Sequence, residues 1–208
     1  QYGSIPEDIR RNITHKKYIF VKVGWRSQYC GINEAEYRGV KYYFIDNEYY
    51  FSRNGLYGHY DDGERFAFFC RAVLEAIPHL DFLPDVIHCH DWQTGIIPVL
   101  LEGDYRNREE YKNIKTVFTI HNLQYQGIFP HSVLGELVGL SDEYFTNDKL
   151  EFYGNINYMK GGLVYSNLLT TVSPTYAQEI QYPYFGERLD GLLRARQNQL
   201  SGIINGID

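Results

Sequence analysis

The sequence has few cysteines, no long apolar run and no excess of basic residues. No stretch approaches the roughly 20 continuous apolar residues of a membrane helix, and no signal-peptide pattern opens the chain. A net charge of −6 argues against a nucleic-acid backbone as partner, because such a partner needs a basic face. The three cysteines, Cys30, Cys70 and Cys89, are odd in number and widely spaced, which favours a reduced, cytoplasmic protein over a disulfide scaffold.

The chain has 208 residues, 44% of them hydrophobic, which is enough for one domain with a substantial core. Its first residue is Gln, so we expect a processed or excised piece of a longer protein. Aromatic residues make up 16% of the chain, and 20 of them are Tyr. Such rings often fill the edges of a core, but sugar rings also stack on them. The composition therefore leaves both a core role and a sugar-binding surface open.

Apolar segments alternate with helical patterns along most of the chain. Strands are predicted at 18–25, 40–46, 84–91, 115–120, 168–173 and 200–205, and helices at 64–80, from 94, at 132–140, within 148–167 and at 175–180. Between them, 27–39 is expected to be a polar connection, 47–63 a loop and 102–113 a solvated segment. The later strands are continuously apolar, as in a parallel sheet covered on both faces. We therefore predict an α/β fold, Rossmann-like, with a mostly parallel sheet flanked by helices.

Polar residues follow two of these strands directly. His121 and Asn122 follow the apolar run in FTIHNLQYQGIFP (118–130), and the group HCHDW (88–92) ends the strand before it. If the two strands are parallel neighbours, both groups open on the carboxyl edge of the sheet, where such folds bind ligands. A third polar group, Tyr57 to Asp62, ends a glycine-rich loop.

The histidines of these groups leave two roles open. His88 and His90 share a face of their strand and, with Asp91 and His121, could form a metal set, although the spacing fits no metal motif closely. The alternative for His88 and His90 is that each is a hydrogen-bonded structural histidine.

Asp91 and Trp92 form a carboxylate–indole pair at a strand end, which is costly to bury without a purpose. Asp91 could bind a sugar hydroxyl while Trp92 offers a stacking face, and Asp91 could also cap the helix that begins near Thr94. Further along, the group 160–162 (KGG) is only superficially like a phosphate loop, because it lacks the full motif. Close packing of a helix is the preferred interpretation of its two glycines.

Seven blocks in order, spread over essentially the whole chain, resemble the ADP-glucose-dependent glucan synthases of glycosyltransferase family 5, namely bacterial glycogen synthase and plant starch synthase. The blocks are VGWRSQYCGI, YYFIDNEYYF, PDVIHCHDWQTGIIPVLL, TVFTIHNLQYQGIFP, LEFYGNINYMKGGLVYSN, TTVSPTYAQEIQYPYFG and LDGLLRARQNQLSGIINGID. The resemblance implies the N-terminal half of a GT-B fold, in which two Rossmann-like domains face each other across a cleft. It also implies transfer of glucose from ADP-glucose to the non-reducing end of an α-1,4-glucan, with retention and with no metal or other cofactor.

The same resemblance assigns roles to five residues. His121 matches the family's catalytic histidine, and Asn122 follows it in the sugar site. Asp91 and Trp92 match the family's HDW residues, which contact sugar near the acceptor side. Tyr60 matches, more loosely, a tyrosine that also faces the acceptor.

The chain departs from the family at both ends. It lacks the family's first strand with its Lys-x-Gly-Gly loop, and it stops at NGID, before the second domain that carries most of the nucleotide-binding groups. We therefore expect residues 1–208 to be a single truncated N-terminal catalytic domain, inactive by itself. A non-catalytic glucan-binding module and a metal-dependent hydrolase using His88, His90 and His121 are the rival hypotheses.

Overall fold

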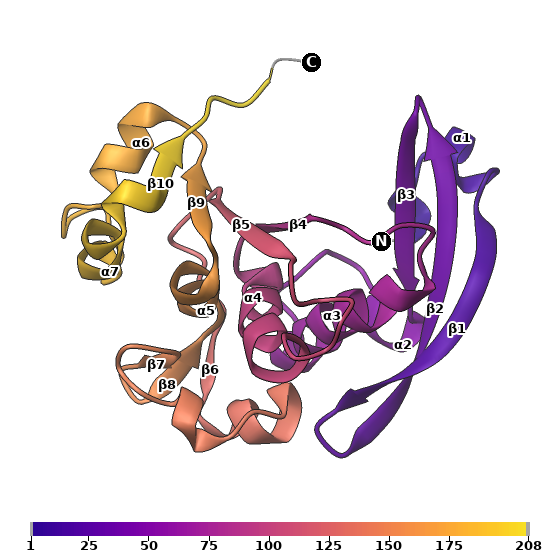
Figure 1. Ribbon diagram of the computed structural model, residues 1–208, viewed down its shortest axis with the longest axis horizontal. Helices are drawn as coiled ribbons and strands as arrows, with labels where there is room; N and C mark the ends of the chain where they lie inside the picture. Colours follow the sequence, from indigo (N-terminus) through magenta and orange to yellow (C-terminus); the bar gives the residue numbers. More distant parts are fainter. Residues whose placement is uncertain (1, 207–208) are drawn as a thin grey trace.

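A computed structural model describes residues 2–206, and its strands form three separate sheets (Figure 1). The first is antiparallel and consists of β1 (Thr14–Val23), β2 (Arg26–Tyr37) and β3 (Val40–Asp46). The expectation of a polar connection at 27–39 is therefore wrong. The polar residues of β2 misled the prediction, because they alternate with inward-facing residues such as Cys30 and Ile32, which are fully buried.

The second sheet is parallel and has the order β10-β9-β5-β4. Its strands are β4 (Val86–His90), β5 (Lys115–Ile120), β9 (Leu168–Thr171) and β10 (Leu200–Gly202). Each was predicted, β5 with the same bounds and the other three with at least one end that differs by one to three residues. The parallel, Rossmann-like sheet is thus confirmed, and β4 and β5 are direct neighbours in it.

Helices, short helical turns and the small third sheet make up the rest of the described structure (Figure 1). The helices are α1 (Glu7–Arg10), α2 (Glu48–Phe51), α3 (Asp62–Ala76), α4 (Ile96–Leu100), α5 (Tyr158–Tyr165), α6 (Pro174–Glu179) and α7 (Asp190–Ala195). Short 3-10 turns occur at Tyr2–Ser4, Ile77–His79, Trp92–Thr94, Asp142–Tyr144 and Gln197–Gln199, and π-helical turns at Leu101–Tyr105 and Leu134–Val138. A small antiparallel sheet has the order β6 (Ile128–Pro130), β8 (Asn155–Asn157), β7 (Glu151–Phe152).

The segment 102–113, expected to be solvated, contributes two tyrosines to the core. Tyr105 and Tyr111 are almost completely buried, and their hydroxyls donate to the Glu75 carboxylate at 2.6 Å and to the Leu74 carbonyl at 2.9 Å. The charged residues around them concealed this pattern. The segment therefore anchors the end of α3 as well as meeting solvent.

Helix α5 packs closely on its neighbours through two glycines, as expected. A Cβ on Gly161 would lie 2.9 Å from Val99, and one on Gly162 would lie 2.3 Å from the Phe118 ring. Lys160 beside them is buried, and its ammonium group donates to the carbonyls of Asn147 and Glu151. The KGG group thus serves packing, which fixes α5 against the strand that leads into His121.

Two further findings bear on the expectations from composition. All three cysteines are free and buried. Among residues 2–206, no helix combines the length and apolar character that crossing a membrane requires.

Candidate functional site

The polar ends of β4 and β5 lie side by side. His90 pairs with Thr119 in the parallel register, and the backbone N–H of Asp91 donates to the Thr119 carbonyl at 3.0 Å. The Asp91 carboxylate then accepts a hydrogen bond from the backbone N–H of His121 at 2.8 Å. The two groups that the sequence placed at one sheet edge are therefore joined directly.

Asp91 adopts an unusual backbone conformation, with φ of +57°. A non-glycine residue in this region, where ψ is −178°, costs about 1–3 kcal/mol, and such strain clusters at functional sites. Asp91 precedes the 3-10 turn Trp92–Thr94, but its side chain makes no capping bond there. The expected capping role is wrong, because the carboxylate bonds to His121 instead.

Trp92 does not offer the stacking face expected of it. Its side chain is only 6% exposed and packs against the rings of Phe66, Phe129 and Tyr158. Deep burial leaves no open indole face for a sugar. Trp92 instead packs the turn that follows Asp91 against α3, β6 and α5.

The three histidines of the site form a row rather than a metal cage. His88 Nε2 lies 2.6 Å from the Thr119 hydroxyl, the rings of His88 and His90 lie 4.3 Å apart, and His90 Nδ1 lies 3.0 Å from His121 Nε2. Within residues 2–206, no group of three or more metal-ligating side chains is arranged to hold an ion. The hydrogen-bonded interpretation of His88 and His90 is the one that the geometry supports.

Electrostatics favour the neutral form of two imidazoles in this row, those of His88 and His90. Burial, followed by the neighbouring histidines, lowers the pKa of His90, and burial followed by His121 lowers the pKa of His88. Neutral rings can each donate and accept one hydrogen bond.

A buried side-chain amide, that of Gln126, fixes the loop after His121. Gln126 is 6% exposed, and its Nε2 donates to the carbonyls of Leu123 and Glu187 at 3.1 and 3.0 Å. Its Oε1 accepts from Asn157, whose own side chain caps α5. Asn122 stays exposed, and its side chain closes the turn by accepting from the Gln124 N–H at 3.0 Å.

Among the tyrosines of the glycine-rich loop, Tyr57 rather than Tyr60 contacts the His121 loop. The ring of Tyr57 lies 6.4 Å from that of Tyr125, and both side chains are about half exposed. Tyr60 is 96% exposed and makes no ring contact with the site. Two exposed rings near a row of polar groups are suited to a pyranose, which has apolar faces and hydroxyl edges.

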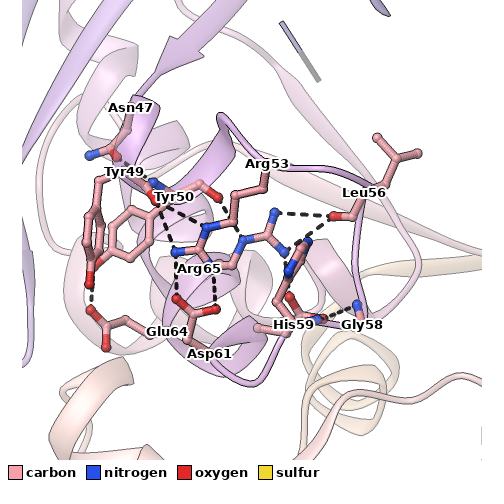
Figure 2. A network of polar contacts seen from close by, with 11 residues as sticks. Asn47, Tyr49, Tyr50, Arg53, Leu56, Gly58, His59, Asp61, Glu64 and Arg65 are labelled. Atoms are coloured by element: carbon pink, nitrogen blue, oxygen red, sulfur yellow. Dashed lines mark hydrogen bonds and ion pairs between the residues drawn. The ribbon is translucent and has the colours of Figure 1, made fainter.

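A buried arginine fixes the loop that carries Tyr57 (Figure 2). Arg65 is fully buried in α3, pairs with Asp62, and donates to the carbonyls of Tyr50 and Leu56. Asp62 in turn accepts from two consecutive backbone N–H groups near the end of the loop, those of Gly58 and His59.

A second ion pair closes the same loop, between Arg53 and Asp61 (Figure 2). Burial is the largest single influence on the Asp61 carboxyl and by itself would raise its pKa. The hydrogen bonds and the positive charge of Arg53 outweigh it, so the pKa of Asp61 is lowered. Tyr57 is therefore presented by a loop tied at several points.

Sequence reasoning missed three supports of the site: Gln126, Arg65 and the bond between His90 and His121. An arginine three residues after an aspartate, at the start of a predicted helix, indicates an ion pair, and this spacing could have pointed to Arg65. The role of Gln126 and the bond between His90 and His121 depend on contacts between residues 31 positions apart in the chain, and the local sequence does not indicate them.

Comparison with known proteins supports one family. A model of the starch synthase catalytic domain family matches residues 1–195. The chain is 61% identical to a glycogen synthase of Anoxybacillus flavithermus and 60% identical to one of Geobacillus stearothermophilus, over all 208 residues in each case. It spans 43% of the length of each of these relatives.

A solved structure of a starch synthase also matches this chain. The catalytic domain of starch synthase IV from Arabidopsis thaliana, bound to ADP and acarbose, matches with a TM-score of 0.87 and 32% identity. The match covers 94% of this chain and 41% of that one. The expected fold class, one Rossmann-like half of a GT-B glycosyltransferase, is thereby confirmed. Because the family model covers nearly the whole chain, the chain belongs to the starch synthase catalytic domain family.

Proposed function

We propose that this chain is the acceptor-side part of a glycogen or starch synthase, which transfers glucose from ADP-glucose to the non-reducing end of an α-1,4-glucan with retention. The observation that carries the proposal is the bond from the His121 N–H to the Asp91 carboxylate. It joins the HDW and HN motifs into one site, in a chain about 60% identical to glycogen synthases. The ligands bound in the starch synthase IV structure, ADP and acarbose, are a nucleotide and an oligosaccharide mimic of matching chemistry.

In this proposal His121 orients the transferred glucose, and Asn122 meets the same sugar. Asp91 holds the His121 backbone through one carboxylate oxygen and keeps the other for a sugar hydroxyl. We propose that Tyr57 and Tyr125 stack on the acceptor glucan. Tyr60 is fully available to solvent and would contact only a longer acceptor. Trp92 acts by packing rather than by touching sugar.

We further propose that residues 1–208 form a truncated N-terminal domain of a cytoplasmic enzyme. Glucosyl transfer needs stabilisation of the diphosphate leaving group, and such electrostatic stabilisation is usually the largest catalytic contribution. The family supplies those cations from a second domain. The isolated chain is therefore expected to be inactive, because the charge that develops on the leaving group would meet no cations.

A chimeric enzyme tests this proposal. The chain replaces its matching segment in the Geobacillus stearothermophilus glycogen synthase, and elongation of maltooligosaccharides is measured with ADP-glucose. We expect an active chimera, a loss of about 10²-fold or more in kcat for His121→Ala, and no elongation by residues 1–208 alone. A folded but inactive chimera would refute the proposed function, and robust elongation by the chain alone would refute the need for a second domain.

A glucan-binding module without catalysis is the second candidate, favoured by the exposed pair Tyr57 and Tyr125. It predicts that the 208-residue chain binds maltoheptaose in a calorimetric titration and that Tyr57→Ala weakens this binding. Tyr153→Ala, which removes an exposed tyrosine from the turn between β7 and β8, is the matched control. Absence of binding by the unmodified chain would count against this candidate.

A further inference from the structure

His90 and His121 are joined by a hydrogen bond between their rings. His90 is the last residue of β4, and His121 directly follows β5. His90 Nδ1 and His121 Nε2 are 3.0 Å apart, with ring centroids at 5.2 Å and planes inclined by 36°. At this separation one nitrogen carries a proton and the other accepts it.

His90 is itself held in place from two directions. Its backbone N–H donates to the Thr94 hydroxyl at 2.6 Å, and its ring lies 4.3 Å from that of His88. His88 is fixed in turn by its bond to the Thr119 hydroxyl on β5. The His90 side chain is exposed, but its backbone is fixed and its ring lies against that of His88, so the neighbour that His90 offers to His121 has contacts of its own.

His121 needs such a partner because little else fixes its ring. Asp91 holds its backbone N–H, but this bond leaves the side-chain torsions free. The side chain is exposed, and an exposed imidazole would otherwise sample several rotamers and both neutral tautomers. The bond from His90 engages Nε2 and leaves Nδ1 as the ring nitrogen available to a ligand.

We propose that His90 is a positioning residue, which holds the His121 imidazole in one orientation and one tautomer so that Nδ1 meets the transferred sugar. The inference rests on the proposed function for its catalytic meaning, but the hydrogen bond itself can be tested without activity. His90 acts through His121 and need not touch the sugar.

Nuclear magnetic resonance tests the bond on the 208-residue chain labelled with nitrogen-15. We expect a through-hydrogen-bond coupling between His90 Nδ1 and His121 Nε2, and a single-tautomer pattern for His121 at pH 7.5. His90→Leu should convert His121 to averaged tautomers, and His90→Asn should restore part of the ordered pattern by keeping a polar atom near the Nδ1 position. His15→Leu, which removes an exposed histidine bonded to Asn33 on another sheet, is the matched control. Averaged tautomers for His121 in the unmodified chain would overturn the proposal.

Kinetics test the positioning role in the chimeric enzyme. A misplacement of the reacting group by about 1 Å costs on the order of 10²-fold in rate, so His90→Leu should lower kcat by that amount. The KM for maltooligosaccharide should stay unchanged, and His90→Asn should recover much of the rate. An unchanged kcat for His90→Leu in an active chimera refutes the positioning role alone. An inactive parent chimera refutes the proposed function, and the catalytic part of this inference with it, whereas the resonance experiment still decides the bond.

Discussion

Replacing Gly127 with Ala should destabilise the loop that carries His121. Gly127 ends this loop just before β6 and has φ of +62°, a conformation that favours glycine. A Cβ at this position would lie 2.3 Å from Cε3 of Trp92. The indole has no room to retreat, because it is 6% exposed and packed on the rings of Phe66 and Phe129.

Two costs add in this variant. The left-handed backbone conformation costs a residue with a Cβ about 1–2 kcal/mol, and overpacking a filled core costs about 1–3 kcal/mol. The free energy of unfolding should therefore fall by about 2–5 kcal/mol in total. Gly154→Ala is the matched control, because its φ of +80° carries the first cost while no atom lies within 4 Å of the added Cβ.

Urea unfolding of the two variants, followed by circular dichroism, measures the difference. With an m-value of roughly 2–3 kcal/mol per molar urea, the overpacking cost of about 1–3 kcal/mol should place the midpoint of Gly127→Ala about 0.3–1.5 M below that of Gly154→Ala. Equal midpoints would refute the reasoning, since only the contact with Trp92 distinguishes the two sites. In the chimeric enzyme, Gly127→Ala should also lower kcat, because the clash displaces the His121 loop.

Three further outcomes are expected. Gln126→Leu removes the amide that bonds Asn157, and urea unfolding should show a loss of about 1–3 kcal/mol; an unchanged midpoint would mean that water replaces the amide. Arg65→Met leaves the Asp62 carboxylate buried without its partner, which should cost about 3–5 kcal/mol, whereas a loss under about 1 kcal/mol would show that the pair is solvated. Since burial lowers the pKa of His88, the unfolded chain binds more protons than the folded protein below about pH 6.5. Stability should thus fall as the pH is lowered from 7 to 5, less steeply in His88→Asn, and identical slopes would contradict this.

Much of the site's position could be predicted from sequence because it follows from sheet geometry. Continuously apolar strands indicate a parallel sheet, and parallel neighbours end at one edge, so the group HCHDW and His121 had to meet there. The glycines of 160–162 were likewise interpretable, because Gly161 and Gly162 lie where a Cβ would strike Val99 and Phe118. These predictions needed only periodicity and the size of side chains.

Other features depend on the direction in which a side chain points, which the local sequence does not encode. β2 looked like a connection because its outward residues are polar while its inward ones are few. Tyr60 and Tyr57 are three residues apart in a loop whose conformation is decided elsewhere, by the buried pair of Arg65 and Asp62. Only the folded loop shows that Tyr57 is the tyrosine that reaches Tyr125.

The location of Asp91 in a site could be predicted from the sequence, but the bond that its side chain makes could not. Its carboxylate at a strand end indicated a site, but two roles were open, capping and binding. The structure excludes capping, because the carboxylate bonds the His121 N–H rather than the turn that follows, and a backbone φ of +57° accompanies this bond. The binding role stays a prediction. The backbone strain of about 1–3 kcal/mol is set against a charge-assisted hydrogen bond of similar size, about 1.5–3 kcal/mol. Strain at this residue is therefore tolerated because the bond that accompanies it ties the two strand ends, and with them the two motifs, into one site.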